Sequence, residues 1–596
     1  MSGSNVGRVA PALAFAAIVA TLVAVRLTRH DAAGPAEPRD RSAVAMTKLR
    51  LVDVTERAGL AEPHSHADLT GESAMTAGAA VADVDGDGDL DVYLTRVGLP
   101  NRLLVNDGNG AFVDRAAAAG VEGPAGGSSA AAFGDIDGDG DLDLIVTPAG
   151  DASPAVYLSN GDGTFADATA TSGLADLPAL GDAALAQAHG VTLSDFDRDG
   201  DLDVLMTHWD AQVPAALADA GANDIEPDAD GRTVCPRARW LAARGFPRAA
   251  DAPANRARLY RNDGAGRLSD ATADLGLPFA QIMGFTGRFA DVDGDGWDDL
   301  LVTGDFCTSR VFRNVEGQRF EDITEASRAA TDENGMGSVL TDLNGDGIID
   351  WFVTGIGPVV DAPAPLQLGG FGSSGNRAYL GGGDGTFRDA TDELGLRNGG
   401  WGWGAAFADF ANDGVPELVM TNGYSIGADD TAESADDPIV VWERDGSSTR
   451  PAREVARAAG IRDTGLGRAL VAFDADDDGD LDLLVANFGA EPVLYRNDTE
   501  AAHWLKVRLD DPAAAGNRSG LGARVRVITA SGATTRWLIA GGSYESQEPA
   551  EVHVGLGVQE RFDEIEVTWP GATEPQIVRA GAADRTIVVT RTPSGP

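Results

Sequence analysis

A nine-residue acidic segment occurs seven times between residues 83 and 482, and it restricts the possible folds more than any other feature. Its first copy, Asp83 to Asp91, has aspartate at positions 1, 3, 5 and 9 and glycine at position 6. Carboxylates at these spacings can converge on one hard cation, and Gly88 permits the sharp turn that brings them together. One such match is weak evidence, because acidic turns are common on surfaces. Seven copies in register predict a set of structural calcium sites.

The predicted Ca²⁺ ligands are the side chains at positions 1, 3, 5 and 9 of six of the copies. They are Asp83, Asp85, Asp87 and Asp91; Asp135, Asp137, Asp139 and Asp143; Asp195, Asp197, Asp199 and Asp203; Asp291, Asp293, Asp295 and Asp299; Asp342, Asn344, Asp346 and Asp350; and Asp474, Asp476, Asp478 and Asp482. The remaining copy, the sixth along the chain, runs from Asp409 to Glu417 and has Ala411 at position 3. We expect this sixth loop to stay without an ion, because it lacks one carboxylate.

These segments differ from EF-hand loops in two respects. Position 12, where an EF-hand needs a bidentate glutamate, is Leu94 in the first copy and Val146 in the second. The flanking residues, such as Leu90 to Thr95, are short runs rich in apolar side chains, which predict strands and not amphipathic helices. Each acidic loop is therefore expected to close a β-hairpin.

A second turn signal follows each acidic loop. Asn-Gly or Asp-Gly dipeptides, which favour tight hairpin turns, begin at Asp107, Asn160, Asp263 and Asp384. Each repeat should then hold four strands. Successive acidic loops begin 51 to 67 residues apart, except for 96 residues between the third and fourth. Four-stranded units of this size, repeated around a ring, predict an all-β fold with a seven-bladed β-propeller.

The ring also has a predicted closure. Residues 51–60 carry the pattern that ends a blade, yet they precede the first acidic loop. They have no partner upstream, so they can supply the outer strand that the last blade lacks after Tyr495. Such an exchange joins the first and last blades and removes open sheet edges.

The repeats resemble the FG-GAP or VCBS repeats of integrin α-chain propellers, and roughly residues 48–591 are similar to the cartilage acidic protein family with its ASPIC/UnbV domain. That C-terminal likeness rests on residues 517–529, 541–547, 554–557 and 565–570. The resemblance implies metal loops on one face of the propeller, away from the ligand surface, and a small C-terminal β-sandwich. In that sandwich, Val525 and Val527 should face the core while Arg524 and Arg526 face solvent.

The predicted domains are a signal peptide or signal anchor (1–30), a linker (31–47), the propeller (48–500) and the ASPIC/UnbV-like domain (501–592). The first rests on the apolar run Val9 to Val25, which is flanked by Arg8 and Arg26. Export to the periplasm, the cell surface or the medium suits calcium loops of modest affinity, on the order of 10⁻⁴ to 10⁻³ M, which fill only where calcium is plentiful. The membrane would then be contacted only through that anchor.

A formal charge of −47 argues against nucleic acid or an anionic membrane surface as a partner. We expect a protein or glycan ligand. The favoured recognition element is the insertion 210–255 in the third blade, because it follows the strand after the acidic loop and should emerge on the opposite face. An insertion without function is the alternative.

Residues just before several acidic loops should line the central channel. They are His189, Met283, Met336 and Trp403, each followed by glycine. Packing around the axis is favoured over ligand binding. The segment 541–547, with Ser, Tyr, Glu and Gln side chains, is either a catalytic or sugar-binding loop or a turn whose hydrogen bonds are satisfied internally, and the second interpretation is favoured.

The sequence holds two cysteines, Cys235 and Cys307, which follow strands in neighbouring repeats. A disulfide between them and two free thiols are both compatible with these positions. His64 and His66, near Glu62, are either transition-metal ligands or exposed loop side chains.

No clean catalytic constellation is present. His189 and His208 flank the third acidic loop near Asp210, the best acid/base candidate, but no nucleophile accompanies them. We therefore predict no catalytic residues and a calcium-stabilised binding or adhesion scaffold. The alternative is an enzyme or biosynthetic accessory protein that acts through the loop face or the C-terminal domain.

Overall fold

The computed structural model describes most of the chain between Thr47 and Thr592. The described ranges are 47–65, 75–124, 126–150, 152–174, 187–209, 257–279, 282–305, 307–357, 374–424, 437–444, 450–500 and 502–592. The predicted export segment, the insertion 210–255, His66, Asp210 and Cys235 lie outside these residues. Cys307 carries a disulfide bond.

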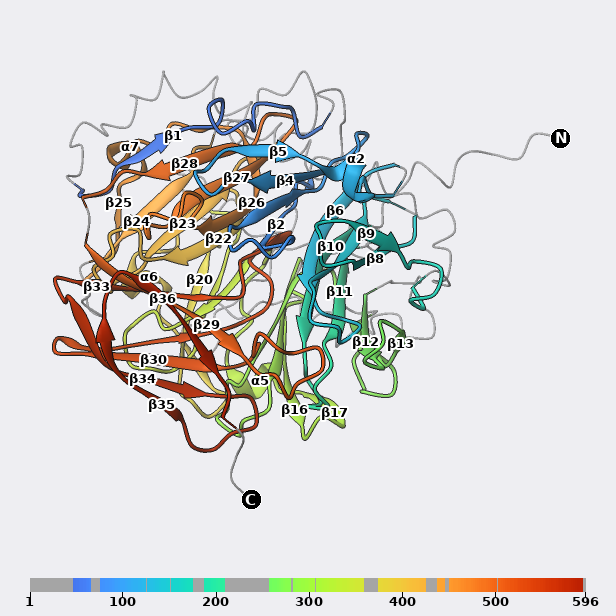
Figure 1. The fold of residues 1–596 in the computed structure, drawn as a ribbon. Coiled ribbons are helices and arrows are strands. Elements are labelled where there is room, and N and C mark those ends of the chain that lie inside the picture. Colours follow the sequence, from blue (N-terminus) through green and yellow to red (C-terminus); the bar gives the residue numbers. More distant parts are fainter. Residues whose placement is uncertain are drawn as a thin grey trace, which may run out of the picture.

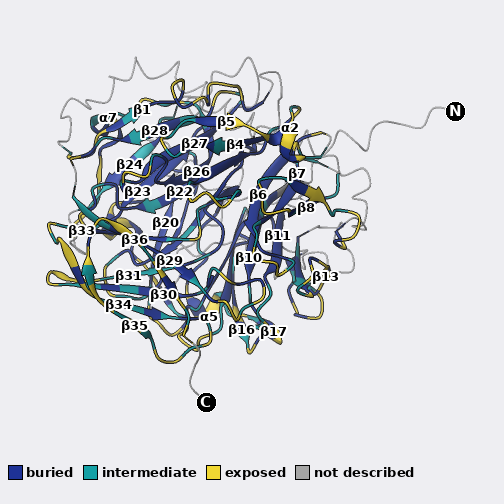
Figure 2. Cartoon of the chain, viewed as in Figure 1, coloured by how far each residue is buried: buried dark blue, intermediate teal, exposed yellow. Residues whose placement is uncertain are grey.

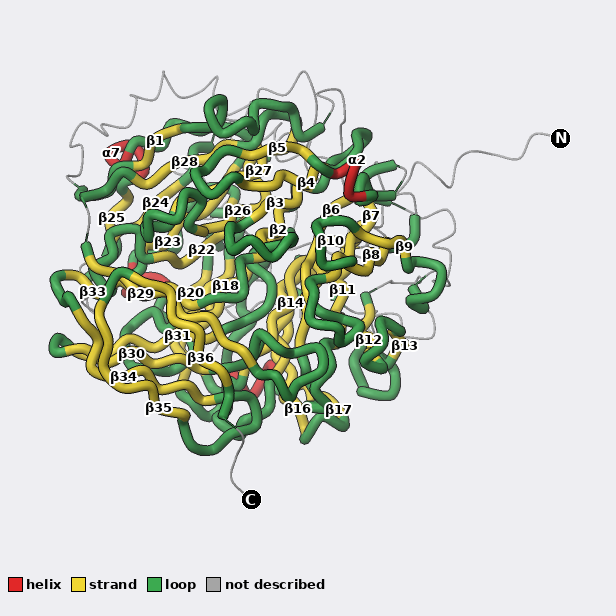
Figure 3. Tube along the Cα trace, in the orientation of Figure 1, coloured by secondary structure: helices red, strands yellow, loops and turns green. Residues whose placement is uncertain are grey.

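Seven sheets form the predicted blades (Figures 1 and 3), each with four antiparallel strands of the propeller, and the sheet of the first blade gains a fifth, parallel strand from the C-terminal domain. The first three are β2 (Ala79–Ala82), β3 (Asp91–Leu94), β4 (Arg102–Asn106) and β5 (Phe112–Asp114); β6 (Ser128–Gly134), β7 (Asp143–Pro148), β8 (Ala155–Ser159) and β9 (Phe165–Asp167); and β10 (Gln187–Ser194), β11 (Asp203–Trp209), β12 (Arg258–Asn262) and β13 (Leu268–Asp270). In each, the acidic loop joins the first strand to the second, so the predicted hairpin is confirmed.

The fourth to sixth blades repeat this order. They are β14 (Gly284–Ala290), β15 (Asp299–Gly304), β16 (Arg310–Val315) and β17 (Arg319–Asp322); β18 (Ser338–Thr341), β19 (Asp350–Val353), β20 (Arg377–Gly381) and β21 (Phe387–Asp389); and β22 (Gly402–Ala408), β23 (Glu417–Asn422), β24 (Val440–Glu443) and β25 (Arg453–Glu454). Single helical turns follow some outer strands: α2 (Ala116–Ala119), α5 (Thr324–Ser327), α6 (Thr391–Leu394) and α7 (Ala456–Ala459).

The seventh blade confirms the predicted closure. It combines β26 (Leu466–Phe473), β27 (Asp482–Phe488) and β28 (Val493–Asn497) with β1 (Leu51–Asp53), which pairs with β28 so that Leu51 faces Asn497 and Asp53 faces Tyr495. The first strands of neighbouring blades contact one another in the order β2, β6, β10, β14, β18, β22, β26 and back to β2. The blades therefore form a complete ring, the seven-bladed propeller that the repeats predicted.

The inner strands are the most buried part of the ring. Every residue of β6 and β14 is buried, whereas the outer strands β5 and β9 bury only their first residue (Figure 2). Alanine, valine, leucine and phenylalanine from facing blades fill the space between them. The burial of this apolar surface is the main contribution to blade packing.

Asparagine side chains at the ends of third strands link neighbouring blades. Asn106 Nδ2 donates to the Ala475 carbonyl oxygen at 2.9 Å, and Asn497 Nδ2 donates to the Phe410 carbonyl oxygen at 2.8 Å. Asn262 and Asn314 make the same bond to the loop of the preceding blade. Each acceptor is position 2 of an acidic loop, so the loop of one blade is fastened to the next.

The C-terminal residues form the expected β-sandwich, with Val525 and Val527 buried and Arg524 exposed, while Arg526 is half-buried. One sheet holds β33 (Val552–Gly557), β29 (His503–Asp510) and β36 (Arg585–Thr590); the other holds β31 (Gly532–Trp537), β30 (Arg524–Thr529), β34 (Arg561–Thr568) and β35 (Gln576–Ala582). Figure 1 shows these strands in red against the propeller. Across the described ranges, no helix has the length and apolarity of a membrane span.

Candidate functional site

The acidic loops are held in shape by their own position-1 carboxylates. In the first loop, Asp83 Oδ1 accepts the Gly86 N–H at 2.8 Å and Asp83 Oδ2 accepts the Gly88 N–H at 3.1 Å. Both glycines have positive φ angles, of 76° and 102°, which other residues adopt with strain. The same bonds recur around Asp135 and Asp291. The repeated glycines thus fold the backbone around the first carboxylate.

Position 9 has a structural role that the sequence did not reveal. Asp91 Oδ2 accepts the Val84 N–H at 3.0 Å, and its Oδ1 accepts the Asn106 N–H at 2.8 Å. The carboxylate therefore ties its loop to the third strand of the same blade. Asp143 and Asp299 make equivalent pairs of bonds.

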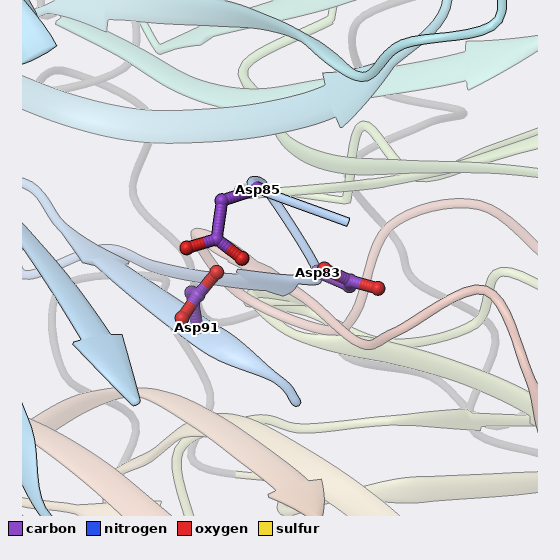
Figure 4. A group of neighbouring side chains, drawn as sticks. All are labelled: Asp83, Asp85 and Asp91. Atoms are coloured by element: carbon purple, nitrogen blue, oxygen red, sulfur yellow. The ribbon is translucent and has the colours of Figure 1, made fainter. Parts of the chain in front are cut away.

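Five of the loops bring three carboxylates to within ligand distance of one another. The groups, whose ligand atoms lie within 4.8 Å, are Asp83, Asp85 and Asp91 (Figure 4); Asp135, Asp137 and Asp143; Asp195, Asp197 and Asp199; Asp291, Asp293 and Asp295; and Asp474, Asp476 and Asp478. The other predicted ligands of these loops lie outside the groups: Asp87, Asp139, Asp203, Asp299 and Asp482. Clusters of carboxylate oxygens match the preference of Ca²⁺.

Buried oxygens without partners support the fit of a cation in the third loop. Asp197 Oδ1 and Asp203 Oδ2 are buried and have no hydrogen-bond partner among the described residues. Burial, followed by the nearby carboxylates, raises the pKa of Asp203 to about 9. The other oxygens have partners: Asp203 Oδ1 accepts the Asn262 N–H at 3.0 Å, and Asp197 Oδ2 is ion-paired with Arg261 Nε at 2.9 Å. A buried carboxylate oxygen without a donor is costly unless a cation compensates it. Asp195, Asp197 and Asp199 would hold Ca²⁺ here, and its charge would also compensate the unpaired oxygen of Asp203.

Two loops lack such a cluster among the described residues. In the fifth, Asn344 Nδ2 donates to Asp346 Oδ2 at 2.8 Å, so the amide bonds its neighbour. In the sixth, Ala411 supplies no ligand, and the Asn412 side chain donates to Asp480 Oδ1 at 2.6 Å.

The calcium-free protein should lose stability as pH rises from about 4 to about 9. Burial raises the pKa of Asp203 to about 9 and of Asp299 to about 8, so the folded chain holds protons that the unfolded chain releases above about 4. Unfolding therefore releases protons, and higher pH favours it. Melting temperatures between pH 5 and 9 in a chelating buffer test this. Calcium should abolish the fall, because it stabilises the ionised carboxylates; a melting temperature that rises with pH without calcium contradicts the prediction.

The sandwich sits on the acidic-loop face of the propeller. The Gly516 and Asn517 N–H groups donate to the Gly200 carbonyl oxygen of the third loop at 2.9 and 3.0 Å. The Gly557 N–H donates to the Asn412 carbonyl oxygen of the sixth loop at 2.7 Å. Arg508 donates to the Gly88 carbonyl oxygen and Lys506 is ion-paired with Asp474, while Gly516, Gly522 and Thr535 lie close to Asp135, Asp298 and Gly347 of the remaining loops. All seven loops therefore meet the C-terminal domain.

A segment of the C-terminal domain, Gly541–Gln547, enters the channel of the propeller and forms an axial plug. Its last two residues, β32 (Ser546–Gln547), pair in parallel with β2, with Ser546 facing Ala79. The Gln547 side chain exchanges two hydrogen bonds with the Phe133 backbone, at 2.5 and 2.8 Å. On the opposite side of the ring, Ser543 Oγ accepts the Ser338 N–H at 3.1 Å. The plug therefore connects blades one, two and five.

Glu545 and Tyr544 form the centre of the axial plug, and both are fully buried. Glu545 Oε2 accepts the Ala77 N–H at 2.7 Å and the Thr76 hydroxyl at 2.9 Å, while Oε1 lies 2.8 Å from His189 Nδ1. Burial holds the pKa of Glu545 well above its usual range. The Tyr544 hydroxyl donates to the Met75 carbonyl oxygen at 2.7 Å. The predicted hydrogen-bond network of 541–547 exists: Ser546 accepts the Gly542 and Ser543 N–H groups within the segment, but the side chains of Tyr544, Glu545 and Gln547 bond to the propeller.

The residues predicted to line the channel surround the Tyr544 ring. Met283, Met336 and Trp403 belong to one buried cluster with Tyr544, and the centroids of the Trp403 and Tyr544 rings are 5.1 Å apart. The ring of His189 lies 5.8 Å from that of Tyr544. Packing around the axis, the favoured interpretation, is what these contacts show.

Three of the histidine candidates for chemistry, His64, His189 and His208, lie in the described ranges and are buried. His189 has no exposed surface, and burial holds its pKa well below the usual range, so it is a neutral partner of Glu545. His64 is 2% exposed, which makes the expectation of an exposed imidazole wrong, and burial lowers its pKa to about 3. Glu62 lies beside Arg102, at 3.9 Å from its Nε.

Sequence reasoning missed the basic residues that the sandwich brings to the loops. Lys506 contacts Asp474 of the seventh loop. Arg508 lies near the first loop and Arg518 near the second. Arg536 lies near both the fifth and the sixth loop. One signal was present: Lys506 is one of two lysines in a chain whose other basic side chains are arginines.

Solved structures resemble this chain only distantly. An Agrocybe aegerita lectin, described as recognising non-reducing terminal N-acetylglucosamine, is 18% identical over 64% of this chain and 80% of its own, with a TM-score of 0.34. A Trypanosoma rangeli sialidase is 10% identical over 66% and 56%, with a TM-score of 0.31. A Bacillus licheniformis rhamnogalacturonan lyase is 12% identical over 76% and 92%, with a TM-score of 0.25. Such scores support no functional argument.

Family models give a clearer result, although no curated protein matches the chain. FG-GAP-like repeats match residues 83–146, 135–206, 249–302, 291–353 and 368–420, and these segments contain the first six acidic loops. The ASPIC and UnbV model matches residues 513–595, which form most of the sandwich and the axial plug. The chain therefore belongs to the family of proteins that join FG-GAP-like repeats to an ASPIC and UnbV domain.

Proposed function

We propose that the protein is an exported, calcium-stabilised binding scaffold that recognises a protein or glycan on the propeller face opposite the acidic loops. The observation that carries this proposal is the position of the C-terminal domain. It covers the acidic-loop face and fills the channel with Gly541–Gln547. A partner that approaches the propeller along its axis meets the other face.

The connections between second and third strands support the choice of that face. They run at the end of each blade remote from the acidic loop, because the loop joins the first strand to the second. In the third blade this connection joins β11, which ends at Trp209, to β12, which begins at Arg258, and is the longest. Long connections on a rigid scaffold are common recognition elements.

Calcium fits the role of a structural ion in this scaffold. The ligand oxygens come from within single loops, and each loop joins the two innermost strands of its blade. A filled loop would hold its hairpin against the repulsion among its carboxylates. Export would supply the calcium that loops of modest affinity need.

The proposal predicts that deletion of residues 212–254, combined with Cys307→Ser because the deletion removes the other cysteine of the chain, Cys235, abolishes partner binding and leaves the fold intact. The full secreted chain and the deletion variant would be compared in millimolar calcium, by capture from extracellular material and on a glycan array. Val558→Asp, at a residue that is 87% exposed on the sandwich, is the matched surface control and should bind normally. A deletion variant that keeps every partner, while Val558→Asp loses them, places recognition on the sandwich and overturns the proposal.

A further inference from the structure

The seventh acidic loop already contains a positive charge from the chain itself. Lys506 of β29 places its Nζ 2.5 Å from Asp474 Oδ2 and 3.2 Å from Asp477 Oδ1. The Lys506 side chain is 3% exposed and that of Asp474 is fully buried. Asp474 is position 1 of its loop, the carboxylate around which the backbone folds: its Oδ2 also accepts the Gly479 N–H at 2.8 Å.

Arg508 and Arg518, the basic residues of the sandwich near the first and second loops, make their ion pairs within their own domain. Arg508 Nε lies 2.8 Å from Glu551, and Arg518 Nε lies 2.8 Å from Asp510. The charge of each arginine is therefore balanced by a carboxylate of the sandwich, although Arg508 lies near the first loop and Arg518 near the second. The ammonium of Lys506 is instead bonded to two loop carboxylates. The seventh loop is therefore the one loop, among the described residues, with a basic side chain of the sandwich ion-paired to its position-1 carboxylate.

The sandwich also packs closely around this loop. The indole of Trp504 lies directly against Gly479 at position 6, and His553 Nε2 is 3.0 Å from the Gly479 carbonyl oxygen. Lys506 Nζ lies 5.2 Å from the Trp504 ring. These three side chains come from adjacent strands of one sheet, β29 and β33. The surroundings of the seventh loop are thus built by the C-terminal domain.

We propose that Lys506 is the resident cation of the seventh loop and excludes calcium from it. The inference refines the proposed calcium binding of the other loops. An ion bound by Asp474 would lie within about 7 Å of the ammonium, since both would contact the same carboxylate, and two positive charges repel strongly at this distance in a poorly hydrated site. In the seventh loop the Lys506 ammonium, which is covalently part of the chain, takes the place of a calcium ion. It balances the negative charge of the loop whenever the two domains are docked.

Terbium luminescence tests this inference, because Tb³⁺ replaces calcium and a nearby indole sensitises its emission. Trp504 lies at the seventh loop, and Trp297 is position 7 of the fourth loop. In the wild-type chain, Trp504→Phe should leave the terbium emission unchanged. In Lys506→Gln, a Trp504-dependent emission should appear, and equilibrium dialysis should find one more calcium per chain. Lys506→Arg, which keeps the charge, is the matched control and should bind no additional ion.

Two results would overturn the inference: Trp504-dependent emission from the wild-type chain, or no gain of emission in folded Lys506→Gln. If Lys506→Gln does not fold, the wild-type comparison with Trp504→Phe still decides. The same experiment distinguishes a failure of the proposed calcium binding in the other loops from a failure of the Lys506 inference. A failure of calcium binding would appear as a wild-type terbium emission that Trp297→Phe leaves unchanged, whatever the seventh loop does.

Discussion

Removing calcium should lower the melting temperature of this protein sharply. Each of the first four loops gathers three carboxylates. Among the described residues, no basic side chain of the sandwich is ion-paired to the position-1 carboxylate of these loops. With free calcium at about 100 times the dissociation constant, each filled site contributes roughly 2.7 kcal/mol. Four independent sites would together contribute roughly 11 kcal/mol, which is comparable with the whole stability of many domains.

The measurement is a thermal melt in millimolar calcium, with and without excess chelator. Magnesium in place of calcium is the matched control, since its smaller octahedral shell suits such loops less well. Asp137→Asn should remove about one quarter of the calcium effect by weakening the second loop. An identical midpoint with and without chelator would refute a structural role for calcium.

The second large effect is expected from Tyr544→Ala, which removes the centre of the axial plug. Tyr544 is fully buried, packs against Trp403 and Phe285, and donates a hydrogen bond to Met75. Truncating a buried aromatic side chain typically costs about 3–5 kcal/mol. The loss should fall on both domains, because this one side chain belongs to the sandwich and packs against the propeller.

Chemical denaturation, followed through tryptophan emission, measures this loss. Tyr544→Phe keeps the ring and removes only the hydroxyl, so it should cost about 1 kcal/mol. Val558→Ala, on the exposed surface of the sandwich, should be close to neutral. If Tyr544→Ala unfolds at the wild-type denaturant concentration, the plug does not hold the domains together.

The two effects have different origins within the same interface. Calcium acts loop by loop on the face of the propeller, whereas the plug acts once, on the axis. Lys506 shares a feature with each, because it acts on one loop as calcium would, yet it is a residue of the C-terminal domain like the plug. A chain that has lost calcium should therefore keep the two domains associated through Lys506–Asp474 and the Glu545 network.

Much of the propeller follows from spacing along the chain. The acidic loop, the Asp-Gly turn and the early blade-ending pattern of residues 51–60 are local, and they recur often enough to show four strands per unit and the closure by β1. The candidate ligands are equally local, since Asp83, Asp85 and Asp91 belong to one turn. A pattern of nine residues therefore predicts both a hairpin and its ion site.

What the sequence by itself determined is thus the repeated unit: the strands, the turns, the number of blades and the carboxylates that each loop offers. Only the tertiary structure decided which face the sandwich covers, what fills the channel and which loop receives Lys506. The reason is sequence separation: Glu545 meets Ala77 across 468 residues, and the turn patterns carry no information about such a pairing. The segment Gly541–Gln547 is predicted as a turn from its sequence, and its place in the channel follows only from the assembled ring.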